Sequence, residues 1–165
     1  MAKDIFAKFG DSITGEADDQ DHVGWCEIYD FKWTLDGKGT PTPDDTETDA
    51  HARGEIKTIS IKKKLDRSST ALASICFKGQ HFAEVVIECY RSAGGEVGGI
   101  KYLELRMQNV VIEKYELALS ESDEELPEED LELAFSYIKI TYYPMDKITA
   151  LAGGQMVVEM DSVAE

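Results

Sequence analysis

Residues Leu65–Glu96, LDRSSTALASICFKGQHFAEVVIECYRSAGGE, contain a helical pattern that is followed at once by a strand pattern. Ser68 or Ser69 can cap the helix, because a serine oxygen accepts a hydrogen bond from a free backbone N–H of the first turn. Gly79 can end the helix in a left-handed conformation. The apolar positions between these residues share one helical stripe: Ala71, Leu72, Ile75 and Cys76. We therefore expect one short helix here.

The period of the sequence changes from helical to alternating at Phe82. Val85, Ile87 and Cys89 then recur at every second position, which indicates a strand with one buried face. Ser92–Gly95 is rich in turn-forming residues and should close this strand. One short helix within a run of strands is typical of a mainly β domain, either a β-barrel or a sandwich flanked by that helix.

Further strand patterns lie on both sides of this stretch. We expect strands at Asp4–Phe9, Trp25–Thr34, Glu55–Lys64, Ile100–Leu119, Leu131–Tyr142 and Gln155–Met160. In the second of these, the large aromatic side chains should share one face: Trp25, Tyr29, Phe31 and Trp33. The alternation of the long fourth strand slips near Asn109, which predicts a bulge that lets one strand serve two parts of a barrel.

Three stretches lack periodicity and are expected to be loops. Asp36–Gly54 contains Pro41 and Pro43 and is long for an irregular segment of a compact domain, so it should either be disordered or serve a function. The other two loops, Glu16–Asp21 and Glu121–Asp130, are dense in carboxylates. We interpret the second of these as a solvated loop rather than a specific cation site.

Length and composition predict a single domain, residues 1–165, that can bury roughly 70% of its unfolded surface. The formal net charge of −16 argues against nucleic acid or an anionic membrane as a partner. Met1–Asp4 lacks the apolar segment of a signal peptide, and no run approaches the length of a membrane span. We expect synthesis in the cytoplasm and no export by the general secretory route.

The three cysteines, Cys26, Cys76 and Cys89, form no CxxC pair and lie within periodic segments. Free cysteines in such positions behave as small apolar side chains, so we expect reduced packing residues. His22 with Cys26, and Cys76 with His81, do not match the spacing of a zinc ligand pair.

Two other sites fail on their residue patterns. A calcium loop would use Asp19, Asp21, Gly24 and Asp30, but Val23 occupies a ligand position and a predicted strand lies inside the loop. The glycines of residues 94–99 precede no Lys-Ser/Thr pair, so turn formation explains them better than phosphate binding. The sequence therefore predicts no catalytic, metal or cofactor site.

Five segments, taken in chain order, carry a family resemblance: Asp4–Phe9 with Gly15-Glu16, Glu27–Trp33, Ser69–Leu72, Ala93–Glu96 and Leu131–Pro144. With the predicted strand order, they resemble the Hcp (haemolysin-coregulated protein) family, the tube-forming component of the bacterial type VI secretion system. Ala71 departs from the family, which often has proline at this position. The tail after Pro144 also lacks the Gly-Trp pair that is common in relatives.

The resemblance implies a mainly β, single-domain β-barrel of two sheets with one α-helix and a long extended loop. It also implies hexameric rings that stack into a hollow tube, which a contractile sheath propels out of the cell beneath a spike. The expected partners are further copies of this chain and the sheath, spike and effector proteins, without nucleic acid or membrane insertion. The resemblance implies neither an enzyme nor a cofactor.

The long loop is the segment that we expect at the subunit interface, where it would dock on the adjacent subunit or ring. Its prolines have a fixed φ, which limits the entropy lost when the loop becomes ordered. The expected interface residues are Asp36, Gly37, Lys38, Gly39, Thr40, Pro41, Thr42 and Pro43. One alternative is a small acidic β-barrel that binds carbohydrate or peptide on Trp25, Trp33 or its tyrosines. A metal-dependent or cysteine enzyme is the other.

Overall fold

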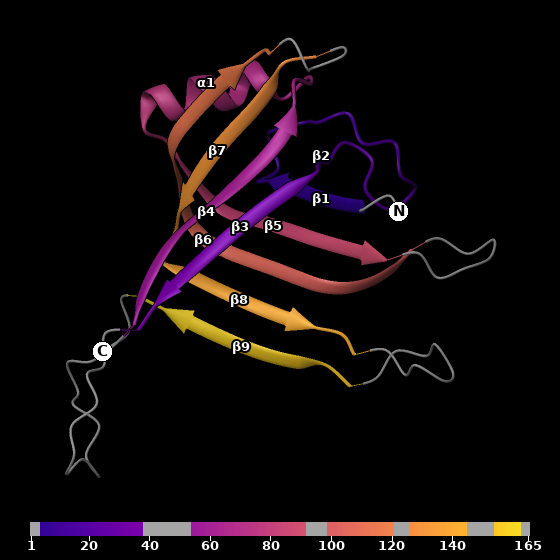
Figure 1. Ribbon diagram of the computed structural model, residues 1–165, viewed down its shortest axis with the longest axis vertical. Coiled ribbons are helices and arrows are strands. Elements are labelled where there is room, and N and C mark those ends of the chain that lie inside the picture. The colour runs from indigo at the N-terminus through magenta and orange to yellow at the C-terminus, as the bar shows by residue number, and fades with distance from the viewer. Residues whose placement is uncertain (1–3, 38–53, 92–98, 121–125, 145–153, 163–165) are drawn as a thin grey trace.

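The computed structural model describes residues 4–37, 54–91, 99–120, 126–144 and 154–162, and these form nine strands and one helix (Figure 1). In chain order the elements are β1 (Asp4–Phe9), β2 (Cys26–Ile28), β3 (Asp30–Asp36), β4 (Glu55–Lys64), α1 (Ser69–Lys78), β5 (His81–Arg91), β6 (Ile100–Ala118), β7 (Glu128–Ala134), β8 (Tyr137–Tyr142) and β9 (Met156–Asp161). The expected mainly β fold with one helix is confirmed.

The strands form one antiparallel sheet organised around the long strand β6 (Figure 1). The first half of β6 pairs with β5 and β8, and its second half pairs with β7. Two runs of strands, β2-β1-β5-β6-β8-β9 and β6-β7-β4-β3, therefore share this strand. Within the described residues the sheet is not closed into a continuous ladder, because β2, β3 and β9 each pair with one neighbour.

The change of partner along β6 occurs where its alternation slips. Asn109 has a left-handed φ of 54°, and the pairing with β7 shifts register between Ile112 and Lys114. Asparagine tolerates this conformation better than most residues. The predicted irregularity that lets one strand serve two parts of the sheet is thus confirmed.

The predicted continuous strand Trp25–Thr34 is wrong, because the chain breaks at Tyr29. β2 pairs with β1, whereas β3 pairs with β4, and the Tyr29 N–H donates to the Lys62 carbonyl at 3.0 Å at the corner between them. The buried face changes across this corner. Cys26 and Ile28 point into the core from β2, while the aromatic side chains of β3 take over that role after the corner.

The predicted strand Leu131–Tyr142 is likewise two strands, β7 and β8, which pair with different halves of β6. β7 also begins earlier than expected. Residues 128–130 belong to this strand rather than to the second acidic loop, because Lys62–Lys64 of β4 supply pairing partners of opposite charge. Residues 121–125 of that loop lie outside the described part of the chain.

The helix α1 lies where the sequence places it. Ser68 is the N-cap residue, although its side chain makes no capping hydrogen bond to the first turn. Gly79 ends the helix with a φ of 63°, and its N–H donates to the Cys76 carbonyl. Leu72 is fully buried in the core, whereas Ile75 and Cys76 are half-buried at its margin.

Candidate functional site

The expected interface segment starts at the end of β3. Asp36 pairs with Glu55, the first residue of β4, and Lys57 Nζ lies 3.8 Å from the Asp36 carboxylate. Gly37 is the last described residue before residues 38–53, so Lys38–Pro43 lie outside the described part of the chain. Because β3 and β4 are antiparallel, Gly37 and Gly54, which flank residues 38–53, lie side by side. Its docking role stays a prediction.

The β8–β9 patch is a group of exposed apolar side chains on both faces of two strands at one end of the sheet. It comprises Tyr142, Met156, Val157 and Val158, which are 41%, 65%, 50% and 47% exposed. In the described part of the chain β9 pairs with β8 alone, so its outer backbone edge is also open. An exposed apolar edge strand is a template for association with another chain.

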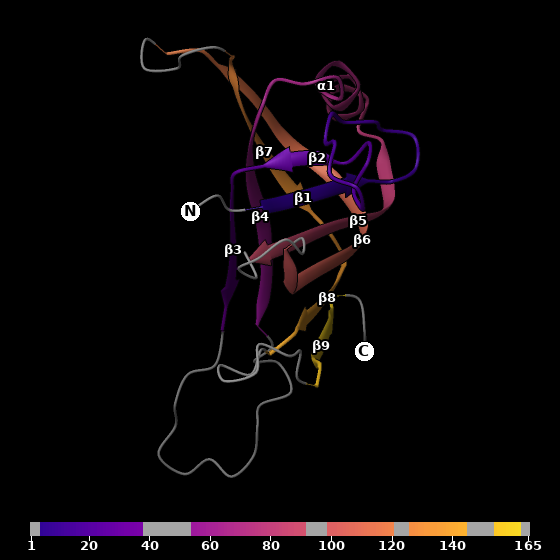
Figure 2. The ribbon, with the colours of Figure 1, turned by 90° about the vertical axis from the view of Figure 1, so that its right-hand side faces the viewer.

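The β6–β7 tip is a second exposed apolar surface, and it lies at the other end of the sheet. It consists of Leu117, Leu119 and Leu126, which are 52%, 66% and 45% exposed. Figures 1 and 2 show the tip at the same end of the molecule as α1, with β8 and β9 at the opposite end. One subunit thus carries two unlike apolar surfaces at its two ends.

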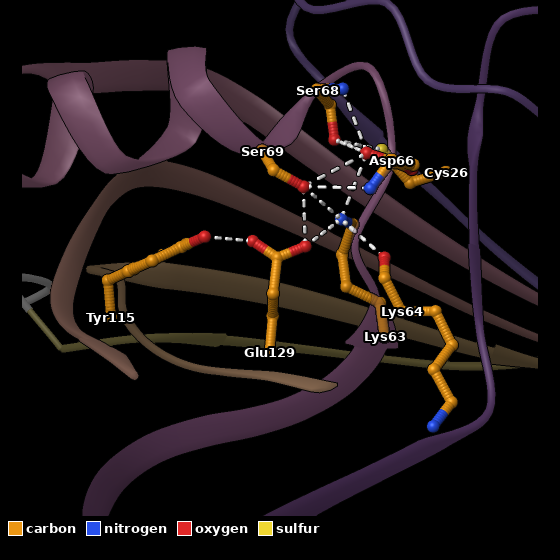
Figure 3. Close-up of polar contacts among 8 residues, drawn as sticks. All are labelled: Cys26, Lys63, Lys64, Asp66, Ser68, Ser69, Tyr115 and Glu129. Atoms are coloured by element: carbon orange, nitrogen blue, oxygen red, sulfur yellow. Dashed lines mark hydrogen bonds and ion pairs between the residues drawn. The ribbon is translucent and has the colours of Figure 1, made fainter. Parts of the chain in front are cut away.

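A buried ion-pair network, the Lys63 network, connects α1 to the sheet (Figure 3). Lys63 of β4 and Glu129 of β7 are direct cross-strand partners, both fully buried, with Nζ and Oε1 2.5 Å apart. Lys63 Nζ also lies 3.0 Å from Asp66 Oδ1 and donates to Ser69 Oγ at 3.3 Å. Tyr115 OH donates to the second oxygen of Glu129. The network joins β4, β6, β7 and the first turn of α1.

Each charge of this network is hydrogen-bonded, which is the condition under which a buried ion pair is tolerated. Ser69 Oγ donates to Glu129 Oε1 at 2.6 Å, and the Ser68 N–H and hydroxyl both donate to Asp66 Oδ1. Burial and the carboxylate of Glu129 raise the pKa of Tyr115, so this hydroxyl stays a donor. We interpret the network as the device that fixes α1 on the sheet.

The sequence contains a signal for the Lys63 network that was not used. Lys63 lies within Lys62-Lys63-Lys64, a run of the kind that usually faces solvent. Its position in β4, however, continues the alternation of Ile59 and Ile61, which both point inward. A lysine at an inward position needs a buried carboxylate, and Glu129 occupies the matching inward position of β7.

A second polar centre, the His22 clasp, joins the buried side chains of His22 and Glu88 to Asp19, which is 46% exposed. Nδ1 of His22 lies 2.6 Å from Asp19 Oδ2, and Nε2 lies 3.0 Å from Glu88 Oε1. The imidazole stacks on Phe6 with a centroid distance of 4.3 Å and meets Trp25 edge to face. Because Asp19 and His22 belong to the loop before β2 and Glu88 belongs to β5, the clasp fastens this loop to the sheet.

The candidate ligand pair His22 and Cys26 is engaged by other partners. His22 is engaged by carboxylates, whereas Cys26 Sγ donates to Ser68 Oγ at 3.3 Å. Cys26 and Cys89 are buried, and burial raises the pKa of each thiol to about 11. Within the described ranges, no group of three or more His, Cys, Asp or Glu side chains is placed to hold a metal ion.

The two tryptophans, which could form a stacking platform for carbohydrate, are both half-buried. Trp33 packs against the core and Trp25 packs against the His22 clasp. Each ring is therefore partly engaged within the subunit. In the part of the chain that the structure describes, no helix is long and apolar enough to cross a membrane.

Together these features define an antiparallel β protein with one flanking helix and apolar surfaces at both ends. Residues 6–142 match the family model described as "Type VI secretion system effector, Hcp". Protein hcp1 of Pseudomonas aeruginosa is 26% identical over 154 residues, which cover 93% of this chain and 91% of that protein. The chain therefore belongs to the Hcp family of type VI secretion system effectors.

The fold is also similar to solved structures of this family. Hcp1 from Salmonella typhimurium superposes with a TM-score of 0.73 at 22% identity, covering 98% of this chain and 96% of that chain. A type VI secretion system effector from Yersinia pestis gives a TM-score of 0.73 at 22% identity, covering 96% and 99%. At these identities the similarity establishes the fold.

Proposed function

We propose that this chain is a structural subunit of the inner tube of a type VI secretion system, forming hexameric rings that stack into a hollow tube. Membership of the Hcp family supports the secretion role. The observation that carries the proposal is the pair of unlike apolar surfaces, the β8–β9 patch and the β6–β7 tip, at opposite ends of one subunit.

Both surfaces need a cover, and a second copy of the chain can supply it. β9 exposes side chains on both of its faces together with one backbone edge, so another chain can pair with it or pack on it. Contact between two unlike surfaces is head-to-tail, and head-to-tail contacts produce a ring when the rotation closes. The net charge of −16 opposes non-specific association of subunits, which favours contacts that are specific.

The long loop adds a second contact to this proposal. Asp36–Pro43 would reach the neighbouring subunit or the neighbouring ring, since a compact domain has no internal use for so long an irregular segment. The tube would be made in the cytoplasm, contact sheath and spike proteins, and leave through the secretion system without a signal peptide. Small effector proteins would travel in its lumen.

Size-exclusion chromatography with light scattering, followed by negative-stain microscopy, tests the assembly. We expect a species of about six times the 18.4 kDa chain mass, and ring-shaped particles. Met156→Lys in the β8–β9 patch and Leu119→Lys in the β6–β7 tip should each reduce the ring fraction, because a charge at an apolar contact loses its hydration. Val23→Lys is the matched control, since Val23 is 74% exposed and lies outside both surfaces.

Two outcomes separate the parts of this proposal. A wild-type chain that stays monomeric at every concentration, without rings under the microscope, contradicts the tube. Replacing Lys38–Ala52 by a short Gly-Ser link should leave far-UV circular dichroism unchanged, weaken ring formation or stacking, and abolish secretion. Rings and tubes that form at wild-type concentrations in this variant would show that the loop makes no assembly contact.

A further inference from the structure

We propose that the loop of residues 10–25 is a pH-responsive cover on β1 and β5, held closed by a proton within the His22 clasp and released when that proton is lost. This inference goes beyond the proposed function and stands independently of it. The loop packs through His22 on the ring of Phe6, which is 7% exposed on the outer side of β1. Opening the loop would uncover this aromatic surface.

Both hydrogen bonds of the clasp need a proton on each ring nitrogen of His22. A neutral imidazole beside two carboxylates is one proton short of this. Both ring nitrogens of His22 lie within hydrogen-bond distance of a carboxylate oxygen, from Asp19 and from Glu88. A neutral imidazole has a single N–H, so it can donate to one of the two carboxylates while its bare nitrogen faces the other. Loss of the proton therefore converts one attractive contact into a repulsive contact between lone pairs.

The charges around the clasp increase the effect of losing this proton. The titratable groups around it are Asp18 and Asp21 in the loop, Glu27 in β2 with Asp4 of β1 close to it, Tyr90 in β5 and Lys101 in β6. Lys101 Nζ lies 3.2 Å from Glu88 Oε2 and compensates the charge of that carboxylate. Burial, together with nearby carboxylates that include Asp19, raises the pKa of Glu27. A neutral His22 would leave the loop carboxylates facing this negative surface.

Most backbone hydrogen bonds of the loop are internal, apart from the Gly10 N–H that donates to the Glu84 carbonyl of β5 at 3.1 Å, while Ile13 and Ala17 anchor its first half on the core. The Gly15 N–H donates to the Gly24 carbonyl at 2.7 Å, and the Ala17 N–H donates to the Trp25 carbonyl at 2.9 Å. Both bonds can persist while the loop moves as a unit away from β5. The clasp thus joins the loop to β5 through a contact whose strength depends on protonation. Histidine is the side chain whose charge changes between about pH 5 and pH 8.

Amide hydrogen exchange of the loop, measured by mass spectrometry and corrected for intrinsic rates, tests the proposal from about pH 5 to about pH 9. The protection of residues 11–25 should fall with rising pH, by up to about tenfold per pH unit while the clasp loses its proton. Residues 82–90 of β5 serve as the internal reference. Loop protection that stays constant across this range overturns the proposal.

Two variants give opposite expectations for the loop, and a third serves as the control. His22→Gln should leave the loop open and remove the pH dependence. Glu88→Gln should keep the loop closed in base, because an amide can donate to the neutral ring or accept from the charged one. His81→Gln is the matched control, since His81 is an exposed histidine at the start of β5, and it should retain the wild-type profile.

Far-UV circular dichroism reports whether each variant is folded. If His22→Gln does not fold, the Glu88→Gln comparison decides alone. A Glu88→Gln loop that opens in base as the wild type does contradicts the proposal. A folded His22→Gln protein with the wild-type pH dependence contradicts it equally.

Discussion

The Lys63 network and the His22 clasp are two polar centres built on a similar plan, and they differ in their consequences. Each places one basic side chain between two carboxylates: Lys63 between Glu129 and Asp66, and His22 between Asp19 and Glu88. Lysine keeps its charge across the physiological range, whereas histidine changes its charge within that range. The first centre is therefore a constant anchor and the second a conditional one.

The position of each centre matches this difference. The Lys63 network fixes α1 to strands of the central sheet, where a release would disturb the core around Leu72. The His22 clasp fastens a surface loop, which can move without breaking strand pairing. A permanent charge thus holds a structural element and a titrating charge holds a cover. Each prediction below tests one side of this contrast.

The largest expected effect comes from removing the constant anchor. Lys63→Met should lower the free energy of unfolding by about 3–5 kcal/mol, because it leaves the fully buried Glu129 without its cation. A urea titration followed by circular dichroism measures this loss. Lys62→Met is the matched control, since the Lys62 side chain is exposed and its ion pairs at 3.9 Å contribute little.

A double variant separates the cost of an unpaired buried charge from the cost of changing the side chains that fill this site. Lys63→Met combined with Glu129→Leu removes both charges, and it should recover part of the stability that Lys63→Met alone loses. A Lys63→Met protein as stable as the control would show that the ion pair does not anchor α1.

The apolar contacts of α1 should give the next largest effect. Leu72→Ala removes a fully buried side chain, so we expect a loss of about 2–5 kcal/mol of unfolding free energy. Ile75 is half-buried, and its replacement by alanine should cost less. The same urea titration measures both. A larger effect for Ile75→Ala than for Leu72→Ala would mean that the buried stripe of the helix has been misassigned.

Local signals allowed much of the fold to be predicted. The helix and the strands Asp4–Phe9 and Glu55–Lys64 were predicted at their observed positions, because helical and alternating periods are properties of adjacent residues. The corner at Tyr29 could not be predicted in this way. It arises because the chain exchanges β1 for β4 as its pairing partner, and alternation alone does not identify partners.

The buried centres depend still more on tertiary structure. Lys63 and Glu129 are far apart in the sequence, and each lies among charged residues that resemble an exposed surface. The sequence spacing compares His22 with Cys26 as a zinc ligand pair, whereas the structure places His22 between Asp19 of its own loop and Glu88 of β5. Residue types and spacing indicate which side chains can interact, whereas the strand order determines which of them meet.

Thiol reactivity can report the state of the Lys63 network. Cys26 Sγ donates to Ser68 at the edge of the network, and burial raises its pKa from 9.0 to about 11. At neutral pH this leaves about a hundredfold less thiolate than an unperturbed cysteine has, so native Cys26 should alkylate slowly. In the Lys63→Met protein the alkylation of Cys26 should accelerate. Cys89, which lies in β5 outside the network, is the internal reference.

Mass spectrometry of iodoacetamide-treated protein gives both rates. Equal acceleration at Cys26 and Cys89 would mean that Lys63→Met loosens the whole domain rather than the network. Fast alkylation of both thiols in the native wild type would contradict their role as packing residues.

The smallest expected effect concerns the behaviour of the His22 clasp at low pH. The hydrogen bond from His22 lowers the pKa of Asp19 below its usual 3.8. A carboxyl with a lowered pKa in the folded state stabilises the closed loop above its unfolded pKa, and this stabilisation is lost as the pH falls through the folded value. The clasp should therefore weaken below about pH 3.8 as well as in base.

Asp19→Asn tests this weakening of the clasp at low pH. Its side chain keeps an acceptor for His22 but has no charge to lose, so loop protection in hydrogen exchange should be lower than in the wild type at neutral pH and flatter in acid. Because the Asp19 side chain is 46% exposed, the solvent screens its interaction and the change should stay small. Asp18→Asn is the matched control, as an exposed neighbour in the same loop. If Asp18→Asn reduces the change of loop protection at low pH as strongly as Asp19→Asn, the general charge of the loop rather than the bond to His22 holds the loop closed.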